Sequence, residues 1–413
     1  MNRRQEDYKC RVSGKRLAPV IDLGRQPLGN GFLTENEFSQ EYFFPMAAGF
    51  CEESKMFQLL EQPEPKKMFH KNYAFFSSTS KHMQTHFQKF AQDILKSPVL
   101  NNEKSFVVEL GCNDGILLRH FSEKKIRHLG IEPSQNVARI AASRGVNTIS
   151  EFFGEDLAER ILEKEGPADH FLSANVMCHI PDILGVARGI KLLLKPKGLL
   201  IFEDPYLGAM ILKTSYDQIY DEHVFLFSAH SVQTLFRKVG MDLISVEPQK
   251  THGGSMRYTL AHEGIFPPDD RVQKVLDEEK NIGLDRLDGF HTFGNKVEKS
   301  KRDLLHLLSE LKKKGKKVVG YAATSKSTTI LNYCQIGPDL IRCIYDTTPL
   351  KYGQFSPGMH IPIRPYGEFV RQPPDYAFLF AWNHSEEIMA KEQGYMAHGG
   401  KWITHVPEVR VIG

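Results

Sequence analysis

The sequence has few tryptophans, few cysteines and no long apolar run. Two of its 413 residues are tryptophan and six are cysteine. No stretch reaches the roughly 18 apolar residues that a membrane-spanning helix needs, so we expect no membrane association. The cysteines are scattered along a long chain, which is typical of a reducing compartment and not of a disulfide framework. The N-terminal stretch MNRRQEDYKC precedes no apolar segment, so we expect no signal peptide and a cytoplasmic protein.

The sequence also lacks a strong excess of charge of either sign. Its net charge is +3, and the basic residues are spread along the chain, so no nucleic-acid-binding surface is predicted. The densest basic run is KKKGKK at 312–317. We predict a helix end there, a stop at Gly315 and the entry to a strand. The alternative for this run is an anion-binding patch.

The chain is longer than one ordinary domain, and its patterns divide it into four parts. Residues 1–70 carry short β-like pieces between glycines and prolines, which predicts a small β-rich module. Residues 71–265 alternate strand and helix patterns, which predicts a parallel, doubly wound sheet. Residues 266–300 are charged and helical, a predicted linker. Residues 301–413 restart the alternation as a smaller Rossmann-like domain, so the predicted fold class is α/β.

The segment SFVVELGCNDGILLRHF (105–121) is predicted to be a strand, a tight glycine turn and a helix. Gly111 and Gly115 would let the backbone approach a ligand that a side chain would block. The dinucleotide fingerprint G-x-G-x-x-G is absent. Glu132 follows the next predicted strand, about 20 residues past the loop, where a doubly wound fold places an acid that binds ribose hydroxyls. The alternative is a glycine-rich turn without a ligand.

Two further side chains follow the third predicted strand, in FLSANVMCHIPD (171–182). Ligands of open α/β sheets lie outside the carboxyl ends of the strands, so Asn175 and His179 should face the same crevice. A structural histidine is the alternative for His179.

The stretch SYDQIYDEHVFLFS (215–228) places four polar residues, Tyr220 to His223, inside an apolar run. A neutral imidazole suits a base that removes a weakly acidic C–H proton. The adjacent carboxylate of Glu222 could hold that imidazole in one tautomer, and the hydroxyl of Tyr220 could donate to a developing oxyanion. A structural hydrogen-bond network is the alternative.

Several motifs occur in order along nearly the whole chain. They are CRVSG…VIDLGRQPLGNGFL, YAFFSSTS, ELGCNDG, ANVMCHIPD, FEDPYLG, YDQIYDEHVFLFS, HGGSMRYTL, GYAATSKSTT and PGMHIPI. Together they resemble the C-methyltransferases of nucleotide-linked deoxysugars, of the dTDP-sugar C-3-methyltransferase type, which use S-adenosylmethionine (SAM). ELGCNDG with GIEP resembles motifs one and two of the broader class I methyltransferases, whereas YDEH is the most specific motif.

The resemblance implies a SAM-binding domain between an N-terminal module and a C-terminal α/β domain, with the nucleotide-sugar in the cleft. His223 would take the C-3 proton of a 4-keto sugar, and the methyl group would transfer to C-3. Hydrogen-bonding and orienting roles would fall to Tyr220, Glu222, His179 and Tyr73. The implied cofactor-binding residues are Glu109, Gly111, Asn113, Gly115, Glu132 and Asn175.

The chain departs from this family at a structural zinc site, which commonly uses two C-x-x-C pairs. Here the pairs are Cys10 with Ser13 and Cys51 with Ser54. A serine hydroxyl is a poor zinc ligand, so zinc is not expected, and Cys10 and Cys51 should lie close together as thiols. Residues that could complete a site, although no spacing requires them, are Glu52, Glu53 and His70.

The C-terminal segment GYAATSKSTTILNYC (320–334) is predicted to be a strand, a small-residue turn and a helix start. Lys326, with Ser327 and Thr328, could hold a diphosphate at the helix N-terminus, although the Walker A spacing is missing. A capped helix on a Rossmann-like turn is the alternative. Arg257 and Asn383 are further predicted substrate contacts, since Arg suits bidentate phosphate binding.

Two other functions remain open from the sequence. A sugar O-methyltransferase would use the same cofactor, with His223 removing a hydroxyl proton. A non-catalytic protein that binds SAM or a nucleotide-sugar would have no need of the Tyr220–His223 cluster. Because the three-part architecture closes its own cleft, we expect a monomer.

Overall fold

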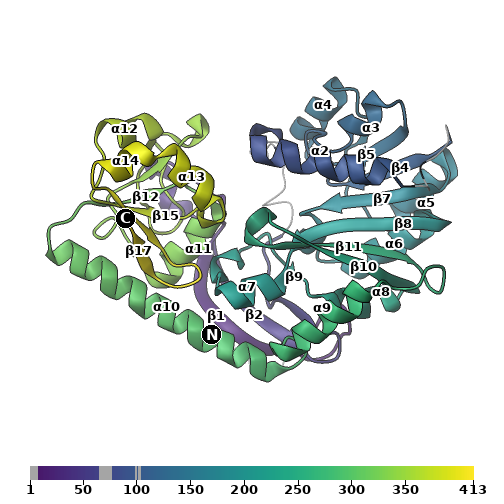
Figure 1. Ribbon diagram of the computed structural model, residues 1–413, viewed down its shortest axis with the longest axis horizontal. Coiled ribbons are helices and arrows are strands. Elements are labelled where there is room, and N and C mark those ends of the chain that lie inside the picture. Colours follow the sequence, from purple (N-terminus) through teal and green to yellow (C-terminus); the bar gives the residue numbers. More distant parts are fainter. Residues whose placement is uncertain (1–7, 65–76, 98–99, 101–103) are drawn as a thin grey trace.

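The structure is a computed structural model. It describes residues 8–64, 77–97, 100 and 104–413. Tyr73 and His70 lie outside the described residues. The described chain forms three sheets, arranged as two lobes joined by a long helix and a narrow sheet (Figure 1). None of the described helices is both long enough and apolar enough to cross a membrane.

The N-terminal sheet is antiparallel and recruits a strand from the middle of the chain. Its strands in spatial order are β1 (Ala18–Pro27), β2 (Phe43–Cys51), β3 (Met56–Leu59) and β9 (Phe225–Leu226). Strand β9 directly follows the Tyr220–His223 cluster. The N-terminal module is therefore joined by backbone hydrogen bonds to the segment that carries the predicted base.

The central sheet has seven strands, five of which are parallel neighbours. Strand β11 is antiparallel to both β8 and β10, between which it lies. The order is β10 (Met241–Gln249), β11 (Ser255–His262), β8 (Leu194–Pro205), β7 (Ala168–Ala174), β4 (Phe106–Leu110), β5 (Arg127–Ile131) and β6 (Thr148–Ile149). This is the class I methyltransferase arrangement, so the predicted fold class is confirmed.

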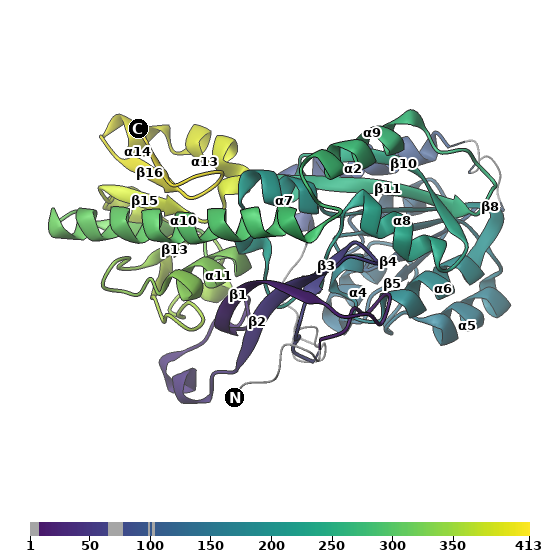
Figure 2. The ribbon, with the colours of Figure 1, turned by 90° about the horizontal axis from the view of Figure 1, so that it is seen from below.

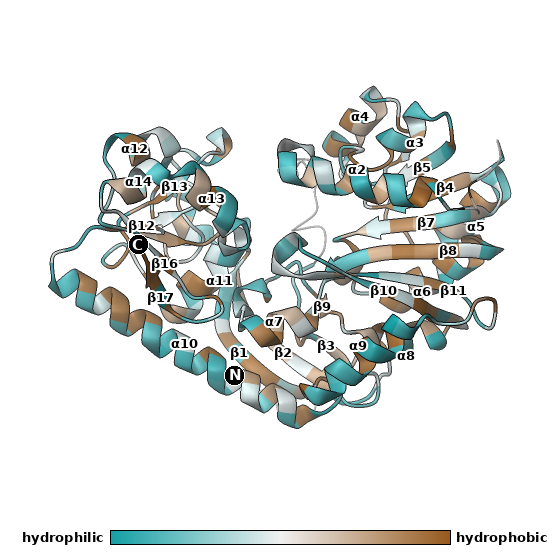
Figure 3. Cartoon of the chain, viewed as in Figure 1, coloured by the Kyte–Doolittle hydropathy of each residue, from teal (hydrophilic) through white to brown (hydrophobic). Residues whose placement is uncertain are grey.

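Helices cover both faces of this sheet, which explains why its inner strands are apolar (Figure 3). Strand β4 is buried along its whole length. Helix α2 buries Met83, Phe87 and Phe90, a spacing that places all three on one face. The helices are α2 (Lys81–Leu95), α3 (Arg119–Glu123), α4 (Gln135–Ser143), α5 (Glu155–Glu165), α6 (Ile183–Leu193), α7 (Leu207–Lys213) and α8 (Ala229–Arg237).

Two helices connect the central domain to the C-terminal domain. They are α9 (Asp270–Asn281) and α10 (Leu287–Lys313). Figure 2 shows α10 running past the N-terminal sheet and along the C-terminal domain. Its Phe290 ring packs against Phe50 and Phe57, with centroids 4.4 and 5.3 Å away. The predicted linker boundary at residue 300 is wrong, because it falls inside this continuous helix.

The C-terminal domain is a smaller α/β unit whose sheet is parallel except for its last strand. As predicted for KKKGKK, α10 ends at Lys313, Gly315 has φ +68° and a strand begins at Val318. The strand order is β14 (Ile363–Pro365), β13 (Ile344–Asp346), β12 (Val318–Tyr321), β15 (Tyr376–Leu379), β16 (Lys401–Thr404) and β17 (Arg410–Ile412). The helices are α11 (Ser325–Cys334), α12 (Tyr366–Arg371), α13 (Ser385–Lys391) and α14 (Gln393–Ala397).

The two cysteine–serine pairs of the N-terminal module come together. The Sγ of Cys10 lies 3.1 Å from Ser54 Oγ, and the Sγ of Cys51 lies 3.3 Å from Ser13 Oγ. The hydrogen bond with Cys51, together with burial, raises the pKa of Cys10. Two thiols and two hydroxyls form a hydrogen-bonded group that does not fit the four strong donors of a structural zinc site.

We predict that Cys10 and Cys51 react slowly with a thiol reagent in the folded protein, because both side chains are buried. Both should react once denaturant unfolds the module, without release of metal. Mass-spectrometric mapping of the labelled cysteines and a chromogenic zinc chelator measure the two outcomes. Release of one zinc ion per chain on unfolding would contradict this reading.

Candidate active site

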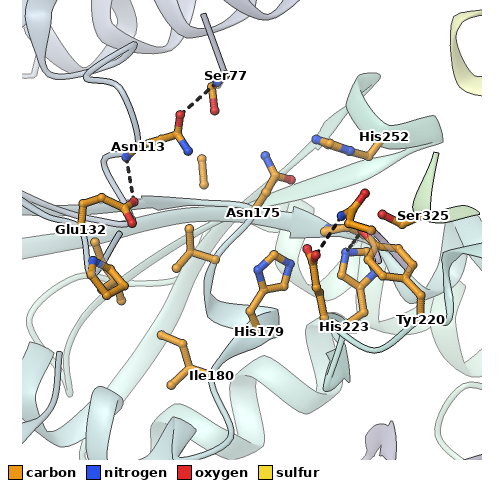
Figure 4. A pocket seen from close by; sticks show the side chains of 18 of the residues that line it. Ser77, Asn113, Glu132, Asn175, His179, Ile180, Tyr220, His223, His252 and Ser325 are labelled. Atoms are coloured by element: carbon orange, nitrogen blue, oxygen red, sulfur yellow. Dashed lines mark hydrogen bonds between the residues drawn. The ribbon is translucent and has the colours of Figure 1, made fainter. Parts of the chain in front are cut away.

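A cavity of about 400 Å³ lies where the three parts of the chain meet (Figure 4). The N-terminal module contributes Asn30. The carboxyl edge of the central sheet contributes Glu132 and Asn175, and the β8–β9 connection contributes His223. Ser325 and other residues at the start of α11 close the far side.

Glu132 marks one end of this cavity. It follows β5, and its carboxylate accepts hydrogen bonds from the backbone of Asn113 at 3.2 Å and of Ser134 at 2.8 Å. The side-chain oxygen of Asn113 in turn accepts the backbone N–H of Ser77 at 3.0 Å. The loop after β4 is therefore tied both to the acid and to the segment before α2.

The loop glycines have a structural reason in addition to the predicted one, which was close approach of the backbone to a ligand. A Cβ on Gly111 would lie 2.3 Å from a methyl carbon of Val176, and one on Gly115 would lie 3.0 Å from Val146. Both residues also have positive φ angles, +70° and +80°. Gly111 lines the cavity, whereas Gly115 does not, so protein packing and backbone conformation require these two glycines.

His223 marks the other end of the cavity and has a defined tautomer. Its Nδ1 donates to the carbonyl of Gln218 at 2.7 Å, and its Nε2 accepts from the hydroxyl of Tyr220 at 2.7 Å. A carbonyl only accepts, so the proton sits on Nδ1 and the lone pair on Nε2. Burial, with a smaller effect of His179, lowers the pKa of His223 well below its usual value. The imidazole is therefore neutral.

The carboxylate expected to orient this imidazole has another partner. Glu222 Oε1 accepts from the side-chain amide of Asn30 at 2.9 Å, while Asp221 Oδ1 accepts from the backbone of Gly29 at 2.9 Å. Burial, then the neighbouring Asp221, raises the pKa of Glu222 to about 8. The sequence-based expectation that Glu222 fixes the tautomer of His223 is wrong, since the Gln218 carbonyl does so.

His179 lies between the two ends of the cavity (Figure 4). Its ring centroid is 5.3 Å from that of His223, with the planes 25° apart, and burial lowers its pKa to about 4. Among the described residues, Cys178, His179 and His223 form a group of metal-ligand atoms within 4.8 Å of one another.

Four other predicted residues lie outside the cavity lining. Lys326 Nζ donates to Asn383 Oδ1 at 3.2 Å, and the backbone N–H of buried Ser327 donates to Oγ1 of Thr324, the N-cap of α11, at 3.1 Å. Arg257 donates from Nε and Nη2 to buried Glu203, at 3.1 and 3.0 Å. The lining of this cavity therefore does not include Lys326, Ser327, Asn383 or Arg257, and their contacts with substrate stay predictions.

The lining also includes residues that the sequence reasoning missed, notably Asn30, His252, Ser325 and Lys351. Lys351 Nζ donates to the carbonyl of Ala323 at 2.7 Å, and no other lysine or arginine is found among the described lining residues. His252 has φ +52°, and burial lowers its pKa to about 3. The motifs HGGSMRYTL, VIDLGRQPLGNGFL and GYAATSKSTT contain His252, Asn30 and Ser325 and were usable signals, whereas Lys351 lies outside every quoted motif.

Comparisons with known proteins agree with this architecture. Residues 80–246 match the family model "Methyltransferase domain", and residues 250–407 match "C-methyltransferase C-terminal domain". The chain is 32% identical to C-methyltransferase NovU of Streptomyces niveus over 411 residues, covering 98% of this chain and 96% of that protein. The chain belongs to the C-methyltransferase family. Residues 10–69 match the model "Putative zinc binding domain", in which this chain carries the two cysteine–serine pairs.

Solved structures similar to this C-methyltransferase include two from cyanobacteria. A SAM-dependent methyltransferase of Anabaena variabilis is 14% identical and covers 49% of this chain and all of its own, with a TM-score of 0.35. Magnesium protoporphyrin IX methyltransferase of Synechocystis, solved with bound SAM, is 11% identical, covering 48% of this chain and 89% of its own, with a TM-score of 0.34.

The residues around Glu132 fit SAM. The ribose hydroxyls of SAM can donate to the Glu132 carboxylate. Asn175 Oδ1 and Glu109 Oε2 are among the buried side-chain oxygens that have no protein partner in the described part of the chain. Asn175 lines the cavity, whereas Glu109 lies beneath the loop and does not. A direct cofactor contact is therefore better supported for Asn175 than for Glu109.

We predict that Gly111→Ala weakens SAM binding and lowers the melting temperature more than the matched control Gly264→Ala. Gly264 has nearly the same φ, +73°, and no heavy atom lies within 4 Å of a Cβ added there. Both variants therefore carry the strain of a left-handed backbone, roughly 1–2 kcal/mol. Only Gly111→Ala adds the clash with Val176. Adding Val176→Ala to Gly111→Ala should restore part of both losses. Calorimetric SAM titration and thermal unfolding measure them. Equal effects of the two single variants would contradict the packing role.

Proposed function

We propose that the protein is a C-methyltransferase acting at C-3 of a nucleotide-linked 4-keto-deoxysugar, in branched-chain sugar biosynthesis. One observation supports this most strongly. A neutral imidazole with a fixed tautomer, that of His223, lies in the same cavity as Glu132, the acid predicted to bind the ribose of SAM. The motif resemblance supplies the substrate class.

His223 would be the base. The 4-ketone acidifies the C-3 hydrogen, and Nε2 of His223 would accept that proton once the Tyr220 hydroxyl has moved aside. Asn113, Glu132 and Asn175 would hold SAM, whose sulfonium would supply the electrophilic methyl group. Among the described residues, the cavity walls include the apolar side chains of Met83, Phe87 and Ile180, which would limit the amount of water in the closed site.

The hydrogen-bonding groups that line the cavity fit methylation of carbon better than methylation of oxygen. An O-methyltransferase needs one base at the reacting hydroxyl. Here Tyr220, Glu222 and His179 surround the base with hydrogen-bonding groups. Such groups suit a reaction in which charge develops on a second atom, the ketone oxygen, while the proton leaves carbon.

The nucleotide would lie toward the C-terminal domain. Lys351 gives this end of the cavity a cation, and Thr324 and Ser325 stand beside it at the start of α11. A diphosphate fits this combination of ammonium group and helix N-terminus. Lys326 and Asn383, which hydrogen-bond to each other outside the lining, would position the start of α11. Because one chain closes the described cavity, we propose a monomer. Tyr73 stays a predicted active-site residue.

The product distinguishes the proposal from O-methylation. We expect methyl transfer from SAM to a thymidine-diphosphate-linked 4-keto-6-deoxy sugar, with the new carbon attached to C-3 in the NMR spectrum of the product. The control is the same sugar with a 4-hydroxyl, which should not react because nothing acidifies C-3. A methyl ether, or equal turnover of the 4-hydroxy sugar, would contradict C-methylation.

The lowered pKa of His223 predicts that activity changes little as the pH falls below 7. A base whose pKa lies well below 6.5 stays deprotonated as pH falls from 7 to 6, so kcat/KM should not show the titration of an ordinary histidine. Burial raises the pKa of Asp221 to about 6, so the profile is measured in Asp221→Asn as well, where that titration is removed. Loss of activity around pH 6.5 in both proteins would contradict a neutral, buried base.

A further inference from the structure

Glu222 is a carboxyl group in an environment that disfavours its charge. Its side chain is 6% exposed, and it lines the cavity. No ion pair with a lysine or arginine involves Glu222 in the part of the chain that the structure describes. Its neighbour Asp221 is a second buried carboxyl group. Two adjacent buried carboxyls without a cation favour holding one charge instead of two.

The hydrogen bonds indicate which of the two carries the charge. Asp221 Oδ1 accepts the backbone N–H of Gly29 at 2.9 Å, and further backbone hydrogen bonds of residues 221 and 222 favour its ionised form. Among the described residues, Glu222 has one donor, the Asn30 amide. Burial and Asp221 raise the pKa of Glu222 to about 8, compared with about 6 for Asp221. At neutral pH the proton therefore belongs to Glu222.

Asn30 also indicates which oxygen holds that proton. Its Nδ2 donates to Oε1 of Glu222 at 2.9 Å, so Oε1 is the accepting, carbonyl-type oxygen. The hydroxyl of the acid is then Oε2. In the described structure, Oε2 makes no hydrogen bond to protein, and Glu222 lines the cavity. A carboxylic acid with a free O–H facing a reaction site is a hydrogen-bond donor to an oxyanion.

Resting on the proposed function, we infer that Glu222 acts as a neutral acid whose Oε2–H donates to the enolate oxygen of the substrate. Asn30 of the N-terminal module is the positioning residue that fixes the proton on Oε2. This assigns a role in the reaction to the loop between β1 and β2.

The step balances without proton transfer from Glu222. His223 Nε2 takes the C-3 proton, the C–H electron pair becomes the C-3–C-4 double bond, and the carbonyl π pair moves to the oxygen. Oε2–H donates to that oxygen while it is charged. When the double-bond pair forms the new carbon–carbon bond, the oxygen pair restores the ketone. The carbon–sulfur bond breaks, and its pair stays on the sulfide. His223 then returns its proton to water.

The test measures deuterium uptake at C-3 of the 4-keto-6-deoxy nucleotide-sugar in heavy water without SAM. Glu222→Gln keeps a neutral donor and should retain exchange within about tenfold, whereas the similarly sized Glu222→Met removes the donor and should lose about 10²- to 10³-fold. Equal, severe losses in both variants, each with unchanged thermal unfolding, would overturn the inference, because a carboxylate would then be required.

The pH profile distinguishes an acid role from a structural one. Wild-type exchange should fall above pH about 8 as Glu222 ionises, and this limb should be absent in Glu222→Gln. Asn30→Ala should lower the rate and move the limb to higher pH, because the Asn30 hydrogen bond favours the ionised form of Glu222. A limb that persists in Glu222→Gln would overturn the inference. Other titratable groups that face Glu222 or line its cavity are Asp221, Tyr220, His223, His179, His252, Glu132 and Lys351.

An infrared measurement separates this inference from the proposed function. The difference spectrum of wild type minus Glu222→Gln at pH 7 should contain the carbonyl band of a protonated carboxylic acid, with no sugar present. A carboxylate band in its place would overturn the inference and leave the proposed function standing. Absence of wild-type C-3 exchange would overturn both, because no enolate would form.

Discussion

The hydrogen bond from His223 Nδ1 to the carbonyl of Gln218 is the interaction on which the chemistry depends. It places the only ring proton on Nδ1 and leaves the Nε2 lone pair for a substrate proton. Burial prevents the ring from being charged before the reaction. The backbone conformation around Gln218, and not a neighbouring carboxylate, therefore prepares the base.

That backbone conformation depends on all three parts of the chain. The β8–β9 connection is followed by a strand that pairs with β3 of the N-terminal sheet. Its Ile219 carbonyl accepts the hydroxyl of Thr329 on α11, and its Asp217 carboxylate accepts the Trp382 indole at 2.7 Å. One hydrophobic cluster, which includes Phe50, Phe290 and Phe378, runs from the N-terminal sheet through α10 into the C-terminal domain. The segment that carries the base is thus held by two sheets and a helix.

Residues carried by strand ends were predictable from the sequence. The strand-end residues Glu132, Asn175 and His179 line the cavity, because parallel strands bring their carboxyl ends to one edge. The Tyr220–His223 cluster was also predictable, because burying polar residues inside an apolar run is costly unless hydrogen bonds or a function compensate for it. The fold class followed from the same alternation of strands and helices.

Other parts of the site depend on contacts between distant segments, which no local pattern encodes. Asn30 meets Glu222 across 192 positions of sequence. Lys351 reaches the cavity from a loop with no recognisable motif. Arg257 was read as a phosphate ligand because its residue type suits phosphate, yet Glu203 on the adjacent strand β8 already neutralises it. Residue type alone does not distinguish a ligand contact from an internal ion pair.

The most direct test is C-3 deuterium uptake by a 4-keto-6-deoxy nucleotide-sugar in heavy water, without SAM, in wild type and in His223→Ala. We expect exchange in the wild type and its loss in the variant. SAM affinity, measured by calorimetry, should be unchanged because Glu132 and Asn175 remain in place. Undiminished exchange in His223→Ala would contradict the assignment of His223 as the base.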